Sequence, residues 1–130
     1  MQVTTDLAFN ATVNATASVN GHWLPWNSSF GLYSTFTAVA NSVAGAVKVD
    51  IFVHLYYKTS ATAPASNITT AEYKVSTALV SDLATEVALQ RYDPPEEMET
   101  AFTWMRVAVV GKSGNSADTS VQVWVTRLVP

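Results

Sequence analysis

The strongest constraint on the fold of this chain is the alternation of apolar and other side chains across residues 47–58. One parity of this segment is entirely apolar or aromatic and consists of Val47, Val49, Ile51, Val53, Leu55 and Tyr57. The other parity consists of Lys48, Asp50, Phe52, His54, Tyr56 and Lys58. Side chains that alternate with a period of two point to opposite faces of a β-strand. The segment therefore predicts a central strand with one dry face.

Several other segments show alternation or an enrichment in β-branched and aromatic residues, and these predict further strands. Residues 7–19 fit either one strand or a bent pair of strands. Residues 81–90 fit a strand and also a short capped helix, and we favour the strand. The remaining expected strands are 30–40, 72–80, 102–110 and 121–129.

Turn-forming residues separate these strands. Asn20-Gly21 and Pro25 predict a loop over residues 20–29, and residues 41–45 predict the turn of a hairpin. Residues 111–120 predict a second hairpin connection, which closes the chain. Residues 59–70 predict an exposed loop that tolerates sequence change, and 91–100 predict a loop that starts with the stiff pair Pro94-Pro95.

About seven to eight short strands without a convincing long helix predict an all-β fold. We expect a single antiparallel β-sandwich, either Ig-like or jelly-roll-like, and a small barrel with the same strand count is the alternative. The length of 130 residues predicts one domain over residues 1–130. Residues 1–6 form a candidate N-terminal arm of that domain.

Composition excludes several classes of function. A hydrophobic content of 48% argues against disorder, and a net charge of −3 with scattered Lys and Arg argues against nucleic-acid binding. The absence of cysteine excludes disulfides and thiolate metal sites. No apolar stretch approaches the ~18 residues of a membrane helix, and the first residues do not resemble a secretory signal. We therefore expect no nucleic-acid or membrane partner.

Residues suited to catalysis are few. His22 falls in a predicted loop and His54 on the less apolar side of the central strand, and neither belongs to a spacing typical of metal ligands or nucleophiles. The simplest interpretation is that His54 occupies the wetter face of its strand and that His22 is a loop or interface residue. We therefore expect no catalytic, cofactor-binding or metal-binding residues, no cofactor, and no enzymatic activity.

Carboxylates cluster in only one segment, which contains Asp93, Glu96, Glu97 and Glu99. Their spacing matches no calcium-binding loop, so a solvated loop or a docking site for a basic partner is expected. A β-sandwich hydrolase with a carboxylate pair drawn from Asp50, Asp82 and Glu86 is a rival hypothesis without positive support.

Tryptophans are the more informative side chains. Trp23 and Trp26 fall in a predicted loop, where they either pack against the end of the sandwich, contact a partner protein, or form a sugar-binding platform with Tyr33. Trp104 and Trp124 fall on the last two expected strands, where pairing across a hairpin is the default interpretation.

Residues 101–111 and 120–128 resemble the closing hairpin of small β-sandwich structural proteins in the virions of tailed bacteriophages. Residues 7–12, 33–40 and 47–53 are similar to the strand order of those proteins. The family includes head decoration or cement proteins, head fibres and tail components. This chain differs from the family pattern in the loop after the central strand, where residues 59–70 replace an Asp-Gly-x-x-Trp type of turn.

The resemblance implies a non-enzymatic virion structural protein. It implies a capsid decoration or cement protein, made in the host cytoplasm, that binds the outer surface of the phage head and stabilises capsomer junctions. Its implied partners are the major capsid protein and its own copies in a homotrimer. The alternative is a carbohydrate- or receptor-binding module of a phage tail or fibre. The candidate interface residues are Val3, Asp6, His22, Trp23, Trp26, Tyr92, Pro94, Pro95, Glu96 and Glu97.

The assignment of these residues to an interface predicts the effect of two changes. Removal of residues 1–6, or replacement of Trp23 and Trp26 by alanine, is expected to leave the fold intact and to weaken attachment.

Overall fold

The computed structural model describes residues 2–26, 34–43, 45–69, 74–83 and 87–129. No helix among them is long and apolar enough to cross a membrane. The elements are, in chain order, β1 (Gln2–Val13), β2 (Ser18–Asn20), β3 (Leu24–Pro25), β4 (Thr35–Asn41), β5 (Val49–Tyr56), β6 (Lys74–Leu83), β7 (Val87–Tyr92), the 3-10 helix η3 (Glu96–Glu99), β8 (Trp104–Gly111) and β9 (Thr119–Val129).

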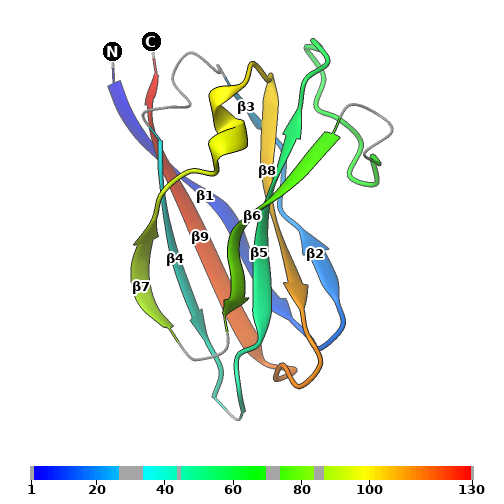
Figure 1. The fold of residues 1–130 in the computed structure, drawn as a ribbon, viewed down its shortest axis with the longest axis vertical. Helices are drawn as coiled ribbons and strands as arrows, with labels where there is room; N and C mark the ends of the chain where they lie inside the picture. Colours follow the sequence, from blue (N-terminus) through cyan, green and yellow to red (C-terminus); the bar gives the residue numbers. More distant parts are fainter. Residues whose placement is uncertain (1, 27–33, 44, 70–73, 84–86, 130) are drawn as a thin grey trace.

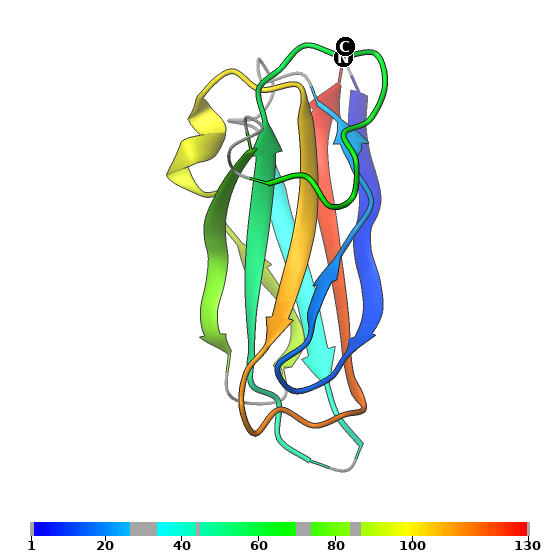
Figure 2. The ribbon, with the colours of Figure 1, turned by 90° about the vertical axis from the view of Figure 1, so that its right-hand side faces the viewer.

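These strands form two antiparallel sheets that pack face to face (Figures 1 and 2). Sheet A has the order β1-β9-β4-β7, and sheet B has the order β2-β8-β5-β6, with β3 also paired to β8. The fold is therefore the antiparallel β-sandwich that the sequence predicts. The described residues contain more strands than the expected seven to eight, because two very short strands, β2 and β3, add to the count.

Most consecutive strands lie in different sheets, and this corrects two predictions. β4 and β5 belong to sheets A and B, and so do β9 and β8, so the expected hairpins at residues 41–45 and 111–120 are crossings between sheets. Trp104 and Trp124 consequently lie in different sheets rather than opposite each other in one hairpin. Turn residues allow the chain to reverse, but the pairing of the next strand depends on which edge it can cover.

The core lies between the two sheets and consists mainly of β-branched side chains. The predicted dry face of the central strand is confirmed, since Val49, Ile51, Val53 and Leu55 are all fully buried. The facing strand β9 contributes Val121, Val123 and Val125, which are also fully buried. Each such side chain contributes roughly 1.5–3 kcal/mol through removal from water.

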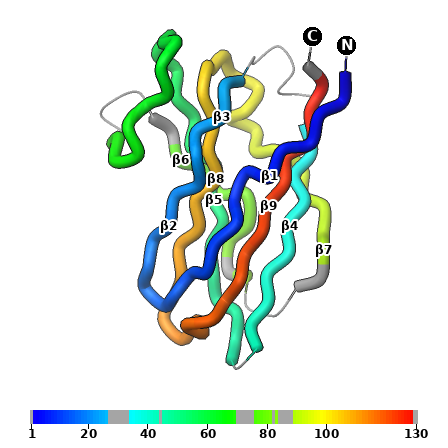
Figure 3. The backbone as a smooth tube through the Cα atoms, turned by 180° about the vertical axis from the view of Figure 1, so that it is seen from behind, coloured from blue at the N-terminus to red at the C-terminus, as the bar shows by residue number. Residues whose placement is uncertain are grey.

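β1 differs from its prediction in two ways. It begins at Gln2, so residues 2–6, which we expected as a candidate arm, pair with β9 in sheet A (Figure 3). A bulge lies between Leu7 and Phe9, so Leu7 is 40% exposed whereas Ala8 and Phe9 are buried. Residues 7–19 form the bent pair, because the chain turns at Thr16, whose φ is 58°, before β2.

Asn115 ties together the end of the sandwich opposite the termini. Its Oδ1 accepts hydrogen bonds from the Lys48 amide and the Thr119 hydroxyl, both at 2.9 Å, and its Nδ2 donates to the Val13 carbonyl at 2.8 Å. The side chain is 6% exposed. These bonds join the end of β1 to the starts of β5 and β9, so side-chain hydrogen bonds fix this end of the molecule.

The segment expected as an exposed loop at residues 59–70 is partly structural. Ile68 is 7% exposed, and the Ser66 carbonyl accepts a hydrogen bond from Arg106 at 2.7 Å. The loop therefore covers part of the outer face of sheet B, and its tolerance to sequence change is limited at these positions.

Candidate interaction surfaces

The predicted interface residues belong to β1, to the segment that contains β3, and to the segment from the end of β7 to η3. The start of β1, β3 and η3 lie toward the end of the sandwich that carries both termini (Figure 1). The exposure of these candidates differs widely. Val3, His22, Glu96 and Glu97 are exposed, and Trp26 is buried. The remaining candidates are half-buried: Asp6, Trp23, Tyr92, Pro94 and Pro95. Six of the ten candidates are therefore not fully exposed.

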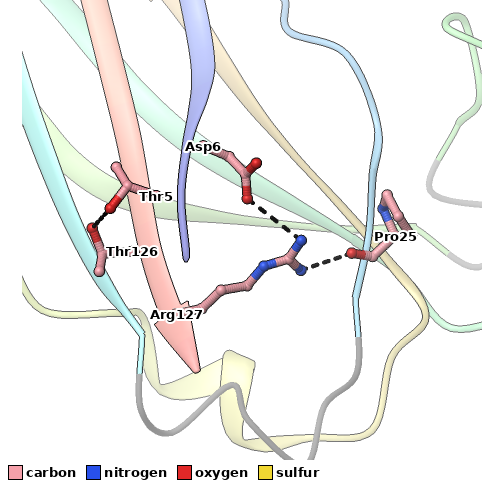
Figure 4. A network of polar contacts seen from close by, with 5 residues as sticks. All are labelled: Thr5, Asp6, Pro25, Thr126 and Arg127. Carbon is pink, nitrogen blue, oxygen red and sulfur yellow. Dashed lines mark hydrogen bonds and ion pairs between the residues drawn. The ribbon is translucent and has the colours of Figure 1, made fainter. Parts of the chain in front are cut away.

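Arg127 joins two of these candidates that come from distant parts of the chain. Its Nη2 lies 3.5 Å from Oδ2 of Asp6, and its Nη1 donates to the Pro25 carbonyl at 2.7 Å (Figure 4). Its guanidinium carbon lies 4.5 Å from the ring centroid of Trp26, which is a cation–π contact. Arg127 thereby links β1 and β9 of sheet A to β3 of sheet B.

Sequence reasoning missed Arg127, although a signal was present. The inward parity of the last strand runs Val121, Val123, Val125 and then Arg127. A charged residue on an otherwise apolar parity indicates a partly buried charge, which needs a partner.

Trp23 and Trp26 do not form the sugar-binding platform considered above. Trp26 is 6% exposed and stacks on Phe102 with ring centroids 5.8 Å apart. Trp23 lies elsewhere, with the Arg106 guanidinium 4.5 Å above its ring and Tyr56 beside it at 6.2 Å. Tyr33, the third member of that platform, lies outside the described residues.

His54 occupies the predicted face of its strand, but this face is not wet at that position. The imidazole is 8% exposed, and its Nδ1 accepts a hydrogen bond from Nε of Arg106 at 2.9 Å. Arg106 is 1% exposed, and burial lowers the pKa of its guanidinium. The pair is held beneath Trp23 and the loop that contains Ser66, which indicates a structural role.

The acidic segment forms η3 and the turn before it. Met98 is 1% exposed and anchors the helix in the core, whereas Glu96, Glu97 and Glu99 are exposed. Glu97 accepts a hydrogen bond from the Thr77 hydroxyl at 2.9 Å. Within the described ranges no three acidic, histidine or cysteine side chains gather in a way that could hold a metal ion.

Tyr92 and Asp50 complete the set of titratable candidates. Tyr92 is half-buried on β7, its hydroxyl donates to Oε1 of Gln90 at 3.2 Å, and burial raises the pKa of the phenol.

Asp50, the first carboxylate of the hydrolase hypothesis, lies 3.6 Å from Nζ of Lys112. The other two carboxylates of the hydrolase hypothesis, Asp82 and Glu86, lie outside the described side chains.

An open cleft of about 560 Å³ lies beside Arg127. Its lining consists of Pro25, Trp26, Ser60, Ala61, Thr103, Trp104 and Arg127. The Trp104 indole is half-buried, and its Nε1 donates to the Ser60 carbonyl at 3.0 Å. Nε1 of Trp26 and Nε of Arg127 are buried donors without a hydrogen-bond partner in the described part of the chain. Indole faces beside a guanidinium suit a sugar ring or an acidic group.

The outer face of sheet A is a second candidate surface, and it is uncharged across its two central strands. Its outward side chains on β9 and β4 are Ser120, Gln122, Trp124, Thr126, Leu128, Thr35, Thr37, Val39 and Asn41. Trp124 lies near the middle of this face, paired with Leu7 on one side and Thr37 on the other. Tryptophan is enriched at protein contact surfaces, so this half-buried tryptophan on an uncharged pair of strands makes the face a candidate contact surface.

Comparisons with known proteins identify relatives in structure only. No family model and no curated protein sequence matches the chain. Solved structures of infectious bursal disease virus do match. The VP2 subviral particle shares 17% identity and a TM-score of 0.54 over 96% of this chain, and the T13 viral particle shares 13% identity and a TM-score of 0.56 over 98%. The Gx strain gives 15% identity and a TM-score of 0.52 over 96%.

The chain spans about one third of the length of the viral chains that it matches, since it covers 31–32% of each. At these identities the likeness concerns the fold. The protein therefore has an antiparallel β-sandwich fold, and this fold also occurs within chains of these virus particles.

Proposed function

We propose that this protein is a non-enzymatic structural component of a virus particle. The observation that carries the proposal is the fold shared with viral capsid proteins over 96–98% of the chain. The outer face of sheet A supports it, because a protein that covers the two central strands of this face buries Trp124 and Val39 and does not bury a charged side chain.

The finer form of the proposal is a capsid decoration or cement protein on the outer surface of a phage head. The resemblance of residues 101–111 and 120–128 to phage virion proteins supports this form. Its partners are the major capsid protein and two further copies in a trimer. A protein that binds only the assembled shell stabilises that shell by mass action. The exposed candidates His22, Glu96 and Glu97 suit contacts with capsomers.

The experiment mixes the purified chain with undecorated phage shells, counts the bound copies and measures the temperature at which the shells break. The proposal expects stoichiometric binding and a higher disruption temperature. Trp124→Ser tests the outer face of sheet A and is expected to lose binding. Val110→Ser changes a half-buried residue on the outer face of sheet B, and this matched control is expected to bind normally.

Two results would contradict these proposals. A chain that does not sediment with shells at any ratio rules out the cement role. Equal binding of the Trp124 and Val110 variants would show that the outer face of sheet A does not contact the shell.

The cleft beside Arg127 favours a second candidate function, a carbohydrate- or receptor-binding module. Trp104 offers a half-buried indole face, and Arg127 offers a guanidinium that suits an acidic sugar. Titration with neutral and acidic glycans should quench tryptophan fluorescence in the native chain and not in Trp104→Ala. Unchanged fluorescence across both glycan classes counts against this function.

A further inference from the structure

The first half of β1 is an open sheet edge that lacks the residues which commonly protect such an edge. Among the described residues, β1 is the first strand of sheet A and pairs within the sheet only with β9. An edge strand presents unpaired backbone N–H and C=O groups, which natural proteins commonly protect with lysine, proline or a bulge. Residues 2–7 contain no lysine or proline, and the bulge of β1 occurs only after Leu7.

The open part of this edge ends at Ala8. The Gly21 amide donates to the Val107 carbonyl at 2.7 Å, which holds the backbone between β2 and β3 against β8. A Cβ atom on Gly21 would lie only 2.5 Å from the Ala8 carbonyl oxygen. The chain itself therefore covers β1 at Ala8, and residues 2–7 remain for pairing with another strand.

The side chains along the open edge are apolar on one face. Val3 is 70% exposed and Leu7 is 40% exposed, which places both among the exposed large hydrophobic residues of the described chain. Thr5 lies between them on the outer face, where its hydroxyl shares a hydrogen bond of 2.9 Å with that of Thr126 (Figure 4). The single charge, Asp6, belongs to the opposite parity and is paired with Arg127.

We infer that residues 3–7 pair antiparallel with the same residues of a second copy of this chain, around a two-fold axis at Thr5. In this register Thr5 lies opposite Thr5 of the second copy. Val3 lies opposite Leu7 of the second copy, and Thr4 lies opposite Asp6 of the second copy. The two sheets A then form one continuous sheet whose outer faces join.

This register follows from parity, charge and burial. A continuous sheet keeps outward side chains opposite outward side chains, so the two-fold axis must pass through a residue position. An axis at Asp6 would place two carboxylates opposite each other and would reach the bulge at Ala8. An axis at Thr4 would place Val3 opposite Thr5. The axis at Thr5 is the one that covers both exposed apolar side chains and separates the carboxylates.

The second copy is the occupant that this edge fits, because the strand is complementary to itself. Its backbone groups need an extended partner, and each apolar residue finds the other apolar residue across the axis. The inference rests on the edge of this chain and does not depend on the proposed function. In a particle the contact would add a two-fold link to the proposed trimer.

A cysteine variant tests the register directly. The chain has no cysteine, so Thr5→Cys introduces one thiol at the axis. Directly opposed residues of antiparallel strands have Cα atoms about 4.5–5.5 Å apart, which is within reach of a disulfide. Mild oxidation should give a disulfide-linked dimer. Leu89→Cys, at a 62% exposed position on the other edge strand of sheet A, is the matched control and should remain monomeric on a non-reducing gel.

Charge variants test the same register in solution. Val3→Lys with Leu7→Lys opposes like charges twice and should weaken dimerisation at least about tenfold. Val3→Lys with Leu7→Glu opposes unlike charges twice and should recover most of the loss. Sedimentation equilibrium over a range of concentrations measures both, and circular dichroism verifies that each variant is folded.

Two outcomes would overturn the inference. One is a native chain that stays monomeric at all concentrations, and the other is a dimer in which Thr5→Cys forms no disulfide. The shell-binding experiment is separate, so a dimer that ignores shells would contradict the proposed function and leave the edge contact established.

Discussion

The guanidinium of Arg106 donates from Nε to Nδ1 of His54 at 2.9 Å, at a place where both side chains are almost completely closed to water. Both residues point to the outer face of sheet B, which in many sandwiches is solvated. The loop that contains Ser66 and the ring of Trp23 cover them here. The pair therefore holds a loop onto a sheet, and burial of a polar pair of this kind is stable only while every partner is present.

Replacement of Arg106 by methionine should destabilise the fold by about 2–4 kcal/mol. The change leaves Nδ1 of His54 and the Ser66 carbonyl without their donor, and each buried group left unsatisfied costs about 1–3 kcal/mol. Urea unfolding followed by tryptophan fluorescence measures the loss. Arg91→Met, at a highly exposed position, is the control and should change stability by less than about 0.5 kcal/mol. Equal effects of the two changes would show that the buried pair adds nothing.

Replacement of Asn115 by alanine should cost about 3 kcal/mol of stability. Alanine leaves the Lys48 amide and the Val13 carbonyl without their partner, whereas the Thr119 hydroxyl keeps the Ser116 carbonyl as its acceptor at 2.9 Å. Asn115→Asp should also destabilise, because a carboxylate cannot donate to the Val13 carbonyl. Thermal unfolding compares both with Ser113→Ala, an exposed change in the same turn. A shift in the unfolding midpoint no larger than that of Ser113→Ala would show that the hydrogen bonds of Asn115 do not stabilise the fold.

Replacement of Trp26 by alanine should destabilise the fold by about 3–5 kcal/mol, contrary to the expectation from sequence that the fold stays intact. The ring is buried against Phe102 and carries the Arg127 guanidinium. Trp124→Ser should cost only about 1 kcal/mol, because that ring is half-buried on a sheet surface. Denaturant midpoints of the two variants measure the difference, and a reversed order would contradict the assignment of Trp26 to the core.

Replacement of Tyr92 by phenylalanine should reduce the loss of stability at alkaline pH. Burial raises the pKa of Tyr92 above its ordinary value of 10.0 in the folded chain. The unfolded chain therefore releases this proton first, so the contribution is fully present below pH 10 and is lost as pH rises through the folded pKa. Urea unfolding between pH 8 and 11 should show a shallower decline in the variant. Parallel curves for the two proteins would mean that Tyr92 ionises equally in both states.

Local patterns in the sequence were sufficient to locate most strands and the core. The alternation from Val47 to Tyr57 predicted a buried face because a strand places every second side chain on one side, whatever lies against it. Residues 121–129 were likewise predicted as a strand, although as the partner of 102–110 in a hairpin. These predictions needed only the geometry of one extended segment, which is local.

The candidate surfaces were predicted less well because they depend on contacts between distant segments. Asp6 and Trp26 were singled out from the sequence as interface candidates, but only folding brings Arg127, more than one hundred residues along the chain, between them. The uncharged face around Trp124 was missed because it combines side chains from strands that are not adjacent in sequence.

The sequence by itself determined that this chain forms strands with one apolar side, that these strands build an all-β fold, and that the chain is poor in catalytic groups. The tertiary structure alone decided which strands pair. Turn residues such as those at 41–45 and 111–120 fix a reversal of the chain, but pairing in the same sheet or crossing to the other sheet differs only in which edges and faces become buried. That balance depends on the whole molecule, and it placed Trp104 and Trp124 in different sheets, His54 beneath a loop, and Val3 and Leu7 on an open edge.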